Sequence, residues 1–107
     1  MKVLISTNEL DSLIYNEKLL IILIGSDSCM PCKAIGNKID DFTKEYNDIK
    51  AIYVPIECFK EYVANLGILS VPTVLVFAEG KLQIKESGYF SLDKILNSII
   101  RIKSFLD

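Results

Sequence analysis

The sequence has no histidine, no tryptophan and no excess of positive charge. Without histidine, the Ser-His-Asp and Cys-His nucleophile systems, histidine-ligated zinc and haem, and most general-base chemistry near neutral pH are excluded. Twelve Lys and Arg residues against fourteen Asp and Glu residues leave a net charge of −2. A nucleic-acid surface normally needs clustered positive charge, so we expect no nucleic-acid partner.

Long apolar runs are also missing. The longest uninterrupted run, Leu19 to Ile24, has six residues, against roughly twenty needed to cross a bilayer. Only three apolar residues follow Met1 and Lys2, too few for the apolar region of a signal peptide. We therefore expect a cytoplasmic protein that does not bind membranes. In that compartment its three cysteines would serve thiol chemistry, metal binding or packing, and not a structural disulfide framework.

The composition is that of a folded domain. Half of the 107 residues are hydrophobic and 24% are charged, which is typical of globular proteins. The scaling of surface area with mass indicates that about two thirds of the chain's surface is buried on folding. We expect a single domain over residues 1–107.

Hydrophobic periodicity and turn residues predict five strands and four helices. The strands are expected at 2–5, 18–25, 50–56, 73–78 and 82–87, and the helices at about 7–16, 32–46, 57–66 and 92–105. The order βαβαβαββα predicts an α/β fold whose mixed sheet is parallel where helices connect strands and antiparallel in the last hairpin.

Three residues carry more detailed expectations. Pro55 lacks a backbone donor, so regular strand pairing should stop at or before it. Gly67 should end the third helix, and Ser91 should cap the fourth. The apolar face of the fourth helix is expected to consist of Leu92, Ile95, Leu96, Ile99, Ile100 and Phe105.

The second predicted helix begins with the segment Cys29-Met30-Pro31-Cys32. Its apolar stripe includes Cys32, whereas Cys29 lies at or just before the first turn. Pro31 is tolerated there because a first-turn N–H has no helical partner. Residues three apart on a helix are neighbours, so the two sulfurs can close a small disulfide ring.

The same helix phase predicts different roles for the two cysteines. The free N–H groups and the positive end of the helix dipole favour a thiolate at Cys29, which makes it the expected nucleophile. Cys32 is then the shielded resolving thiol. The expected mechanism is thiol–disulfide exchange, in which Cys29 forms a mixed disulfide and Cys32 releases the reduced target. This chemistry needs no metal and no organic cofactor, so we expect only the redox-active disulfide.

Four segments, in order and with compatible spacing, resemble those of the thioredoxin family over nearly the whole chain. The segment 29–33 is similar to the family's Cys-Gly-Pro-Cys-Lys, and 71–73 to its cis-proline segment Ile-Pro-Thr. The segment 77–80 resembles the Phe-x-x-Gly hairpin, and Gly88 with Ser91 matches the glycine and helix start beyond it. The resemblance implies a thioredoxin-like fold, a central mixed sheet with helices on both faces, and protein-disulfide oxidoreductase activity.

The resemblance also implies a substrate site and partners. A cis peptide bond is implied between Val71 and Pro72, in a loop that lies against the cysteines. Val71 would offer its backbone to an extended peptide, as in strand addition, and Met30, Pro31 and Pro72 would complete the contact surface. The resemblance implies that the substrates are disulfide-containing proteins. It also implies that the protein is a monomer. Electrons would come from a thioredoxin reductase-like flavoprotein, since the chain has no nucleotide-binding glycine loop.

The chain departs from the family pattern at three positions. Ser28 stands where thioredoxins carry the tryptophan before the first cysteine. Their buried acid corresponds to Leu23, and the lysine partner of that acid corresponds to Tyr53. Both members of the pair that helps to deprotonate the resolving cysteine are therefore missing. We expect Cys32 to lose its proton to water or to the departing thiolate, which makes resolution slow.

Two other interpretations stay open. A thioredoxin-fold binding or adaptor module would hold a partner in the same groove with little or no redox turnover. A metal site could use Cys58 as a third ligand, although a fourth ligand is missing. Cys58 is otherwise expected to be a small, partly buried residue near the start of the third helix, or a regulatory thiol near the same end of the sheet.

Overall fold

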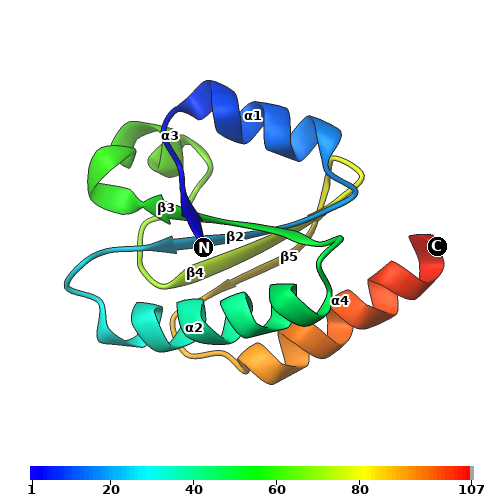
Figure 1. Cartoon of the computed structure of the whole chain (residues 1–107). Helices are drawn as coiled ribbons and strands as arrows, with labels where there is room; N and C mark the ends of the chain where they lie inside the picture. The colour runs from blue at the N-terminus through cyan, green and yellow to red at the C-terminus, as the bar shows by residue number, and fades with distance from the viewer. Residues whose placement is uncertain (107) are drawn as a thin grey trace.

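Five strands form one mixed sheet in the order β1-β3-β2-β4-β5 (Figure 1). The computed structural model describes residues 1–106, and its strands are β1 Lys2–Val3, β2 Leu19–Gly25, β3 Lys50–Pro55, β4 Thr73–Ala78 and β5 Lys81–Ser87. The central strand β2 runs parallel to β3 and antiparallel to β4, and β1 runs parallel to β3. The mixed sheet is as predicted, but β1 is two residues shorter than expected.

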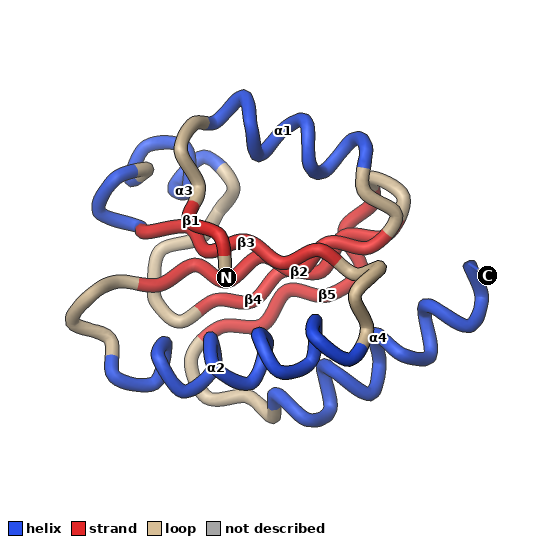
Figure 2. Tube along the Cα trace, in the orientation of Figure 1, coloured by secondary structure: helices blue, strands red, loops and turns tan. Residues whose placement is uncertain are grey.

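Helices cover both faces of this sheet, which confirms the predicted layers. They are α1 Thr7–Asn16, α2 Met30–Glu45, α3 Lys60–Asn65 and α4 Leu92–Leu106. Figures 1 and 2 show α1 and α3 on one face and α2 and α4 on the other. Among residues 1–106, no helix combines the length and the apolar character that crossing a membrane requires.

The core is divided by β2, all seven residues of which are buried. Alternate side chains of a strand point to opposite faces. Accordingly, Leu19, Ile21 and Leu23 pack with α2 and α4, whereas Leu20, Ile22 and Ile24 pack with the cluster under α1 and α3. Each such buried Leu or Ile stabilises the fold by about 1.5–3 kcal/mol relative to an exposed one. The apolar run in the sequence is therefore the shared centre of two cores.

The segment after β3 differs from the single helix expected at 57–66. Pro55 makes the last pair of β3 with Gly25, so pairing stops there as predicted. A 3-10 turn over Ile56–Cys58 follows, and Phe59, at φ −134° and ψ 36°, separates it from α3. Gly67, at φ 79°, ends α3 as predicted, and its N–H donates to Ala64 O at 2.9 Å.

The inward face of α4 also differs in part from the prediction. Leu92, Ile95 and Ile99 are buried, but Ile100 and Phe105 are exposed. The side chains that continue the buried face are Ile102 and Leu106. Steps of three and four residues from Ile99 lead to these two positions, because such steps keep a helical side chain on one face. The predicted cap is present, since Ser91 Oγ accepts from Lys94 N–H at 3.3 Å.

Candidate functional site

Cys29 and Cys32 form a disulfide at the point where the chain passes from the sheet to α2. Strand β2 ends at Gly25, a short loop follows, and Cys29 is the N-cap residue of α2. The Cα atoms of the two cysteines are 5.3 Å apart. The structure thus brings together the two sulfurs that the sequence spacing predicts as a pair.

The first turn of α2 directs a backbone donor at the outer sulfur. Cys32 N–H donates to Cys29 Sγ at 3.3 Å, so this sulfur holds the place that an oxygen takes in an ordinary N-cap. Pro31 lies in the same turn without breaking the helix. An N–H donor and the positive end of the helix both favour negative charge on Cys29 Sγ once the disulfide is reduced.

The two cysteines differ in burial. Cys32 is 3% exposed and belongs to the core, whereas Cys29 is half-buried at the surface. A target disulfide can therefore approach Cys29 but not Cys32. This difference follows from the apolar stripe of α2, which turns Cys32, Ile39 and Phe42 inward.

A groove of about 680 Å³ opens in front of Cys29. All four residues that the sequence predicts as substrate contacts line it, namely Met30, Pro31, Val71 and Pro72. Sequence reasoning missed the other lining residues, which are Ser26, Ser28, Ile35, Gly88, Tyr89, Phe90 and Leu92. None of the side chains that line the groove is charged.

The groove's far wall is the loop before β4. The peptide bond between Val71 and Pro72 is cis, as the family resemblance implies. Pro72 O accepts from Gly88 N–H at 3.1 Å, and Thr73 Oγ1 donates to Ser70 O at 2.8 Å, which ties the loop to its surroundings. Within residues 1–106, the backbone N–H and C=O of Val71 have no hydrogen-bond partner. They are a donor and an acceptor beside the disulfide that another chain can use.

Behind Cys32 the packing is close. A Cβ on Gly25 would lie 2.9 Å from Cys32 Sγ and 2.9 Å from Tyr53 Cε1, closer than real Cβ contacts. Only glycine therefore fits between the inner sulfur and the tyrosine ring. The sequence analysis missed this role of Gly25, because the close approach depends on where β3 and α2 meet in space.

A small pocket of about 270 Å³ lies at this inner side, and Leu23 and Tyr53 line it together with Cys32. Both residues that the sequence analysis aligned with the family's acid and lysine therefore lie beside Cys32. Burial raises the pKa of Tyr53 above its ordinary value, and the nearby acidic groups of Glu57, Asp27 and Cys58 raise it further. Tyr53 is therefore protonated at neutral pH and cannot accept the proton of Cys32.

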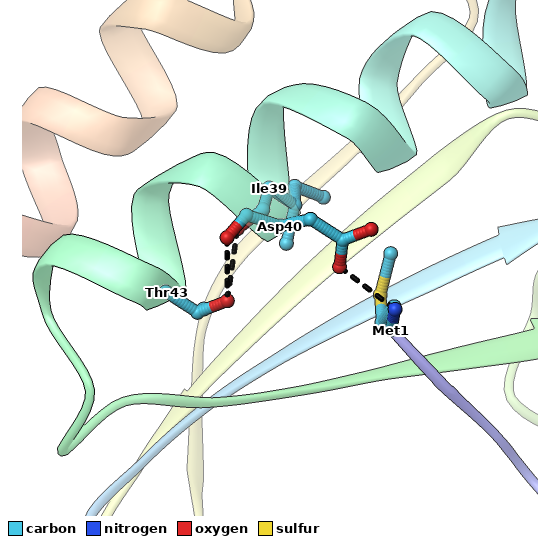
Figure 3. Close-up of polar contacts among 4 residues, drawn as sticks. All are labelled: Met1, Ile39, Asp40 and Thr43. Atoms are coloured by element: carbon cyan, nitrogen blue, oxygen red, sulfur yellow. Dashed lines mark hydrogen bonds and ion pairs between the residues drawn. The ribbon is translucent and has the colours of Figure 1, made fainter.

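A carboxylate in the same pocket, that of Asp40, is already engaged. Its Oδ1 lies 2.8 Å from the Met1 ammonium (Figure 3). The Thr43 hydroxyl bonds to the backbone carbonyls of Ile39 and Asp40, which holds this turn of α2 in place. The Asp40 carboxylate in this pocket is thus held in an ion pair with the first residue of the chain.

Cys58 is a free thiol and is exposed, so the expectation of partial burial was wrong. The reason is its place in the 3-10 turn that follows Pro55, outside both core clusters. In the described part of the chain, no group of three or more His, Cys, Asp or Glu side chains is placed to hold a metal ion. The three cysteines accordingly do not form the metal site considered above.

A cysteine pair at a helix start, facing a cis-proline loop on a sheet of this order, defines a thiol–disulfide oxidoreductase of the thioredoxin-like class. The family model for thioredoxin matches residues 2–101, so the chain belongs to the thioredoxin family. Its protein-disulfide oxidoreductase activity rests on the Cys29–Cys32 pair.

The relatives are themselves thioredoxins. The chain is 26% identical to a thioredoxin of Mycoplasmoides gallisepticum, over 89% of this chain and 95% of the relative. It is 30% identical to thioredoxin 1 of Plasmodium falciparum, over 75% and 77% of the two chains. The solution structure of oxidised thioredoxin from Plasmodium falciparum superposes with a TM-score of 0.82 at 26% identity, covering 92% of this chain and 97% of that one.

Proposed function

We propose that the protein reduces disulfides of other proteins, with Cys29 as the nucleophile and Cys32 as the resolving thiol. The observation that carries this assignment is the unequal burial of the two sulfurs, since Cys32 is 3% exposed and Cys29 borders the groove. The N–H donor on Cys29 Sγ supports the same assignment.

The reaction has two steps. Cys29 thiolate attacks one sulfur of the target disulfide, the target S–S bond breaks, and the other target sulfur leaves as a thiolate. Cys32 then loses its proton to water or to the departing thiolate and attacks Cys29 Sγ. The mixed disulfide breaks, and the target's second sulfur leaves. Two electrons have moved to the target, and the protein holds the Cys29–Cys32 disulfide.

The substrate segment binds in an extended form beside Val71. Its backbone pairs with the free N–H and C=O of Val71, as in the addition of one strand to a sheet edge. Met30, Pro31 and Pro72 supply apolar contacts on either side of the reacting sulfurs. Backbone pairing gives affinity that does not depend on the side chains of the target, whereas the side chains that line the groove set any sequence preference.

Members of the thioredoxin family act on disulfide substrates and are recharged by reductases. For this chain the donor is a thioredoxin reductase-like flavoprotein, which returns two electrons to Cys29–Cys32. We place the reaction in the cytoplasm, because a reducing compartment keeps such a dithiol in its active state. Residues 1–107 act as one domain, since the strands and both helical layers come from one continuous stretch of chain.

A thiol-dependent insulin-reduction assay tests the proposal. Wild-type protein should accelerate insulin precipitation with dithiothreitol, and Cys29→Ser should be inactive. The alternative of a binding module predicts no turnover by either protein, even though the wild-type disulfide forms. Mass spectrometry of the oxidised and alkylated protein verifies that the disulfide has formed.

A further inference from the structure

Tyr89 lies on the rim of the groove with its side chain fully in solvent. It occupies the loop between β5 and α4, next to Gly88 at φ 77°, and its exposure is 106% of the reference value. Its neighbour Phe90 packs against the core, but Tyr89 belongs to neither core cluster. Within the described residues its hydroxyl has no hydrogen-bond partner. Packing therefore does not explain a large aromatic residue here.

A second exposed apolar side chain lines the same groove. Met30 is 75% exposed and follows Cys29 directly in the chain. Burying such side chains against a ligand is favourable in proportion to the apolar area removed from water. Exposed apolar side chains that gather at one groove are typical of an interaction site. The groove between these two residues is thus apolar, and it holds the reactive sulfur.

The groove has no charged lining residue, and this limits what can enter it. A charged side chain that entered would lose water without gaining an ion-pair partner, which is costly. An aromatic or aliphatic side chain would instead gain contacts with the ring of Tyr89 and the flexible thioether of Met30. The chemistry of the lining therefore distinguishes between target sequences.

We propose that Tyr89 and Met30 make this protein selective for target disulfides that carry an apolar or aromatic residue beside the reacting cysteine. The inference rests on the proposed function, because it requires that Cys29 attacks a disulfide held in this groove. Tyr89 is the specificity-determining residue, since its fully exposed side chain is free to close over the substrate residue.

The test uses synthetic disulfide-linked peptides with a fluorophore on one half and a quencher on the other. The residue next to the target cysteine is Phe, Leu, Ser, Asp or Lys. Pre-reduced protein is mixed with each peptide, and second-order rate constants are compared. Wild type should reduce the Phe and Leu peptides about fivefold or more faster than the Ser peptide, since one aromatic contact is worth up to about tenfold. The Asp and Lys peptides should be the slowest.

The variants then assign this preference to Tyr89. Tyr89→Ala should lower the Phe-to-Ser rate ratio by about fivefold, whereas Tyr89→Phe should retain it because the ring is kept. Tyr15→Ala is the matched control, since Tyr15 is an 85% exposed tyrosine on α1 that does not line the groove. The ratio is internal to each protein, so a change in sulfur reactivity cancels.

Each outcome is decisive. A wild-type ratio near one, or an unchanged ratio in Tyr89→Ala, would overturn the selectivity while leaving disulfide reduction intact. If wild type reduced neither these peptides nor a small aromatic disulfide, the proposed function itself would fail and this inference with it.

Discussion

On its outer side the Cys29–Cys32 disulfide borders an open, uncharged groove, whereas on its inner side it rests on Gly25 and the ring of Tyr53. On the outer side, the backbone N–H and C=O of Val71 have no hydrogen-bond partner among residues 1–106, so a bound peptide can pair with them. On the inner side, the space at Gly25 is too small for an added methyl group. Two cysteines three residues apart thus have different surroundings, as their proposed roles of nucleophile and resolving thiol require.

The largest effect on the exchange reaction is expected at Leu23, an apolar side chain that lines the pocket behind Cys32. Leu23→Asp places a carboxylate in the pocket behind Cys32, and it should accelerate resolution of the mixed disulfide by about a hundredfold through general-base catalysis. Rapid mixing with a fluorogenic disulfide separates the concentration-dependent attack from the concentration-independent resolution.

Leu23→Asn is the matched control, because it has the same size and polarity without a proton acceptor. Both variants should lose stability, since Leu23 is fully buried. Only the aspartate should change the resolution rate. Equal resolution rates in Leu23→Asp and wild type would show that the missing acid does not limit this step.

Gly25→Ala tests the close packing under the inner sulfur. The added methyl group would meet Cys32 Sγ and Tyr53 Cε1 at 2.9 Å, so the oxidised protein should lose about 1–3 kcal/mol of stability in urea unfolding. The reduced protein should lose less, because a free Cys32 side chain can rotate away. The disulfide should therefore become easier to reduce, by about 30 mV for each 1.4 kcal/mol of difference.

Gly36→Ala is the control for this variant. A Cβ there would lie 3.7 Å from Leu23 Cδ2, which is an ordinary contact, and Gly36 is in the interior of α2. We expect this substitution to leave the protein equally stable or to stabilise it by up to about 1 kcal/mol. If Gly25→Ala also left the stability of the oxidised protein unchanged or raised it, the close packing at Gly25 would be contradicted.

The smallest effect is expected far from both sides, where Tyr62 donates to Asp11 Oδ1 at 2.6 Å and links α3 to α1. Tyr62→Phe should cost about 0.5–1.5 kcal/mol of stability and leave the disulfide exchange rates unchanged. Burial and the bond to Asp11 raise the pKa of Tyr62 to about 12.

This pKa determines the pH dependence of the Tyr62 contribution. Because the folded-state pKa lies above the unfolded value of about 10, the stabilisation is fully present below pH 10 and is lost as the pH rises through about 12. Urea unfolding of wild type and Tyr62→Phe at pH 8, 10 and 11 should give a difference that narrows at the highest pH. If the stability difference between wild type and Tyr62→Phe stayed constant with pH, the contribution of Tyr62 would come from packing and not from its hydrogen bond.

Much of the fold could be predicted from local patterns. The fully apolar segment of β2 predicts a buried strand, and the apolar stripe of α2 predicts which face of that helix turns inward. The spacing of Cys29 and Cys32 at the start of α2 then predicts their pairing. The break at Phe59 could not be predicted, because its backbone conformation depends on how the segment after Pro55 fits the sheet. On α4, the apolar spacing also predicts Ile100 and Phe105 on the inward face, but steps of three and four residues from Ile99 lead to Ile102 and Leu106 instead.

The residues of the candidate site that lie in family-like segments could be predicted from the sequence. The residues that only the fold brings next to the cysteines could not. Met30, Pro31, Val71 and Pro72 were named from the sequence, and all of them line the groove. Tyr89 lies in a loop without periodicity, so no local pattern placed it beside the cysteines. The sequence predicts Gly25 only as the end of a strand, because its close contact with Cys32 depends on the packing of α2.

Trapping of the mixed disulfide tests the division of roles most directly. Reduced Cys32→Ser and Cys29→Ser variants, each also carrying Cys58→Ser because the Cys58 thiol is free and exposed, are mixed with a disulfide-containing protein, quenched with acid and analysed by mass spectrometry. Cys32→Ser should accumulate a covalent complex through Cys29, because attack proceeds and resolution cannot, whereas Cys29→Ser should form none. A complex that accumulated on Cys32 in the Cys29→Ser variant, with none on Cys29 in Cys32→Ser, would contradict the account.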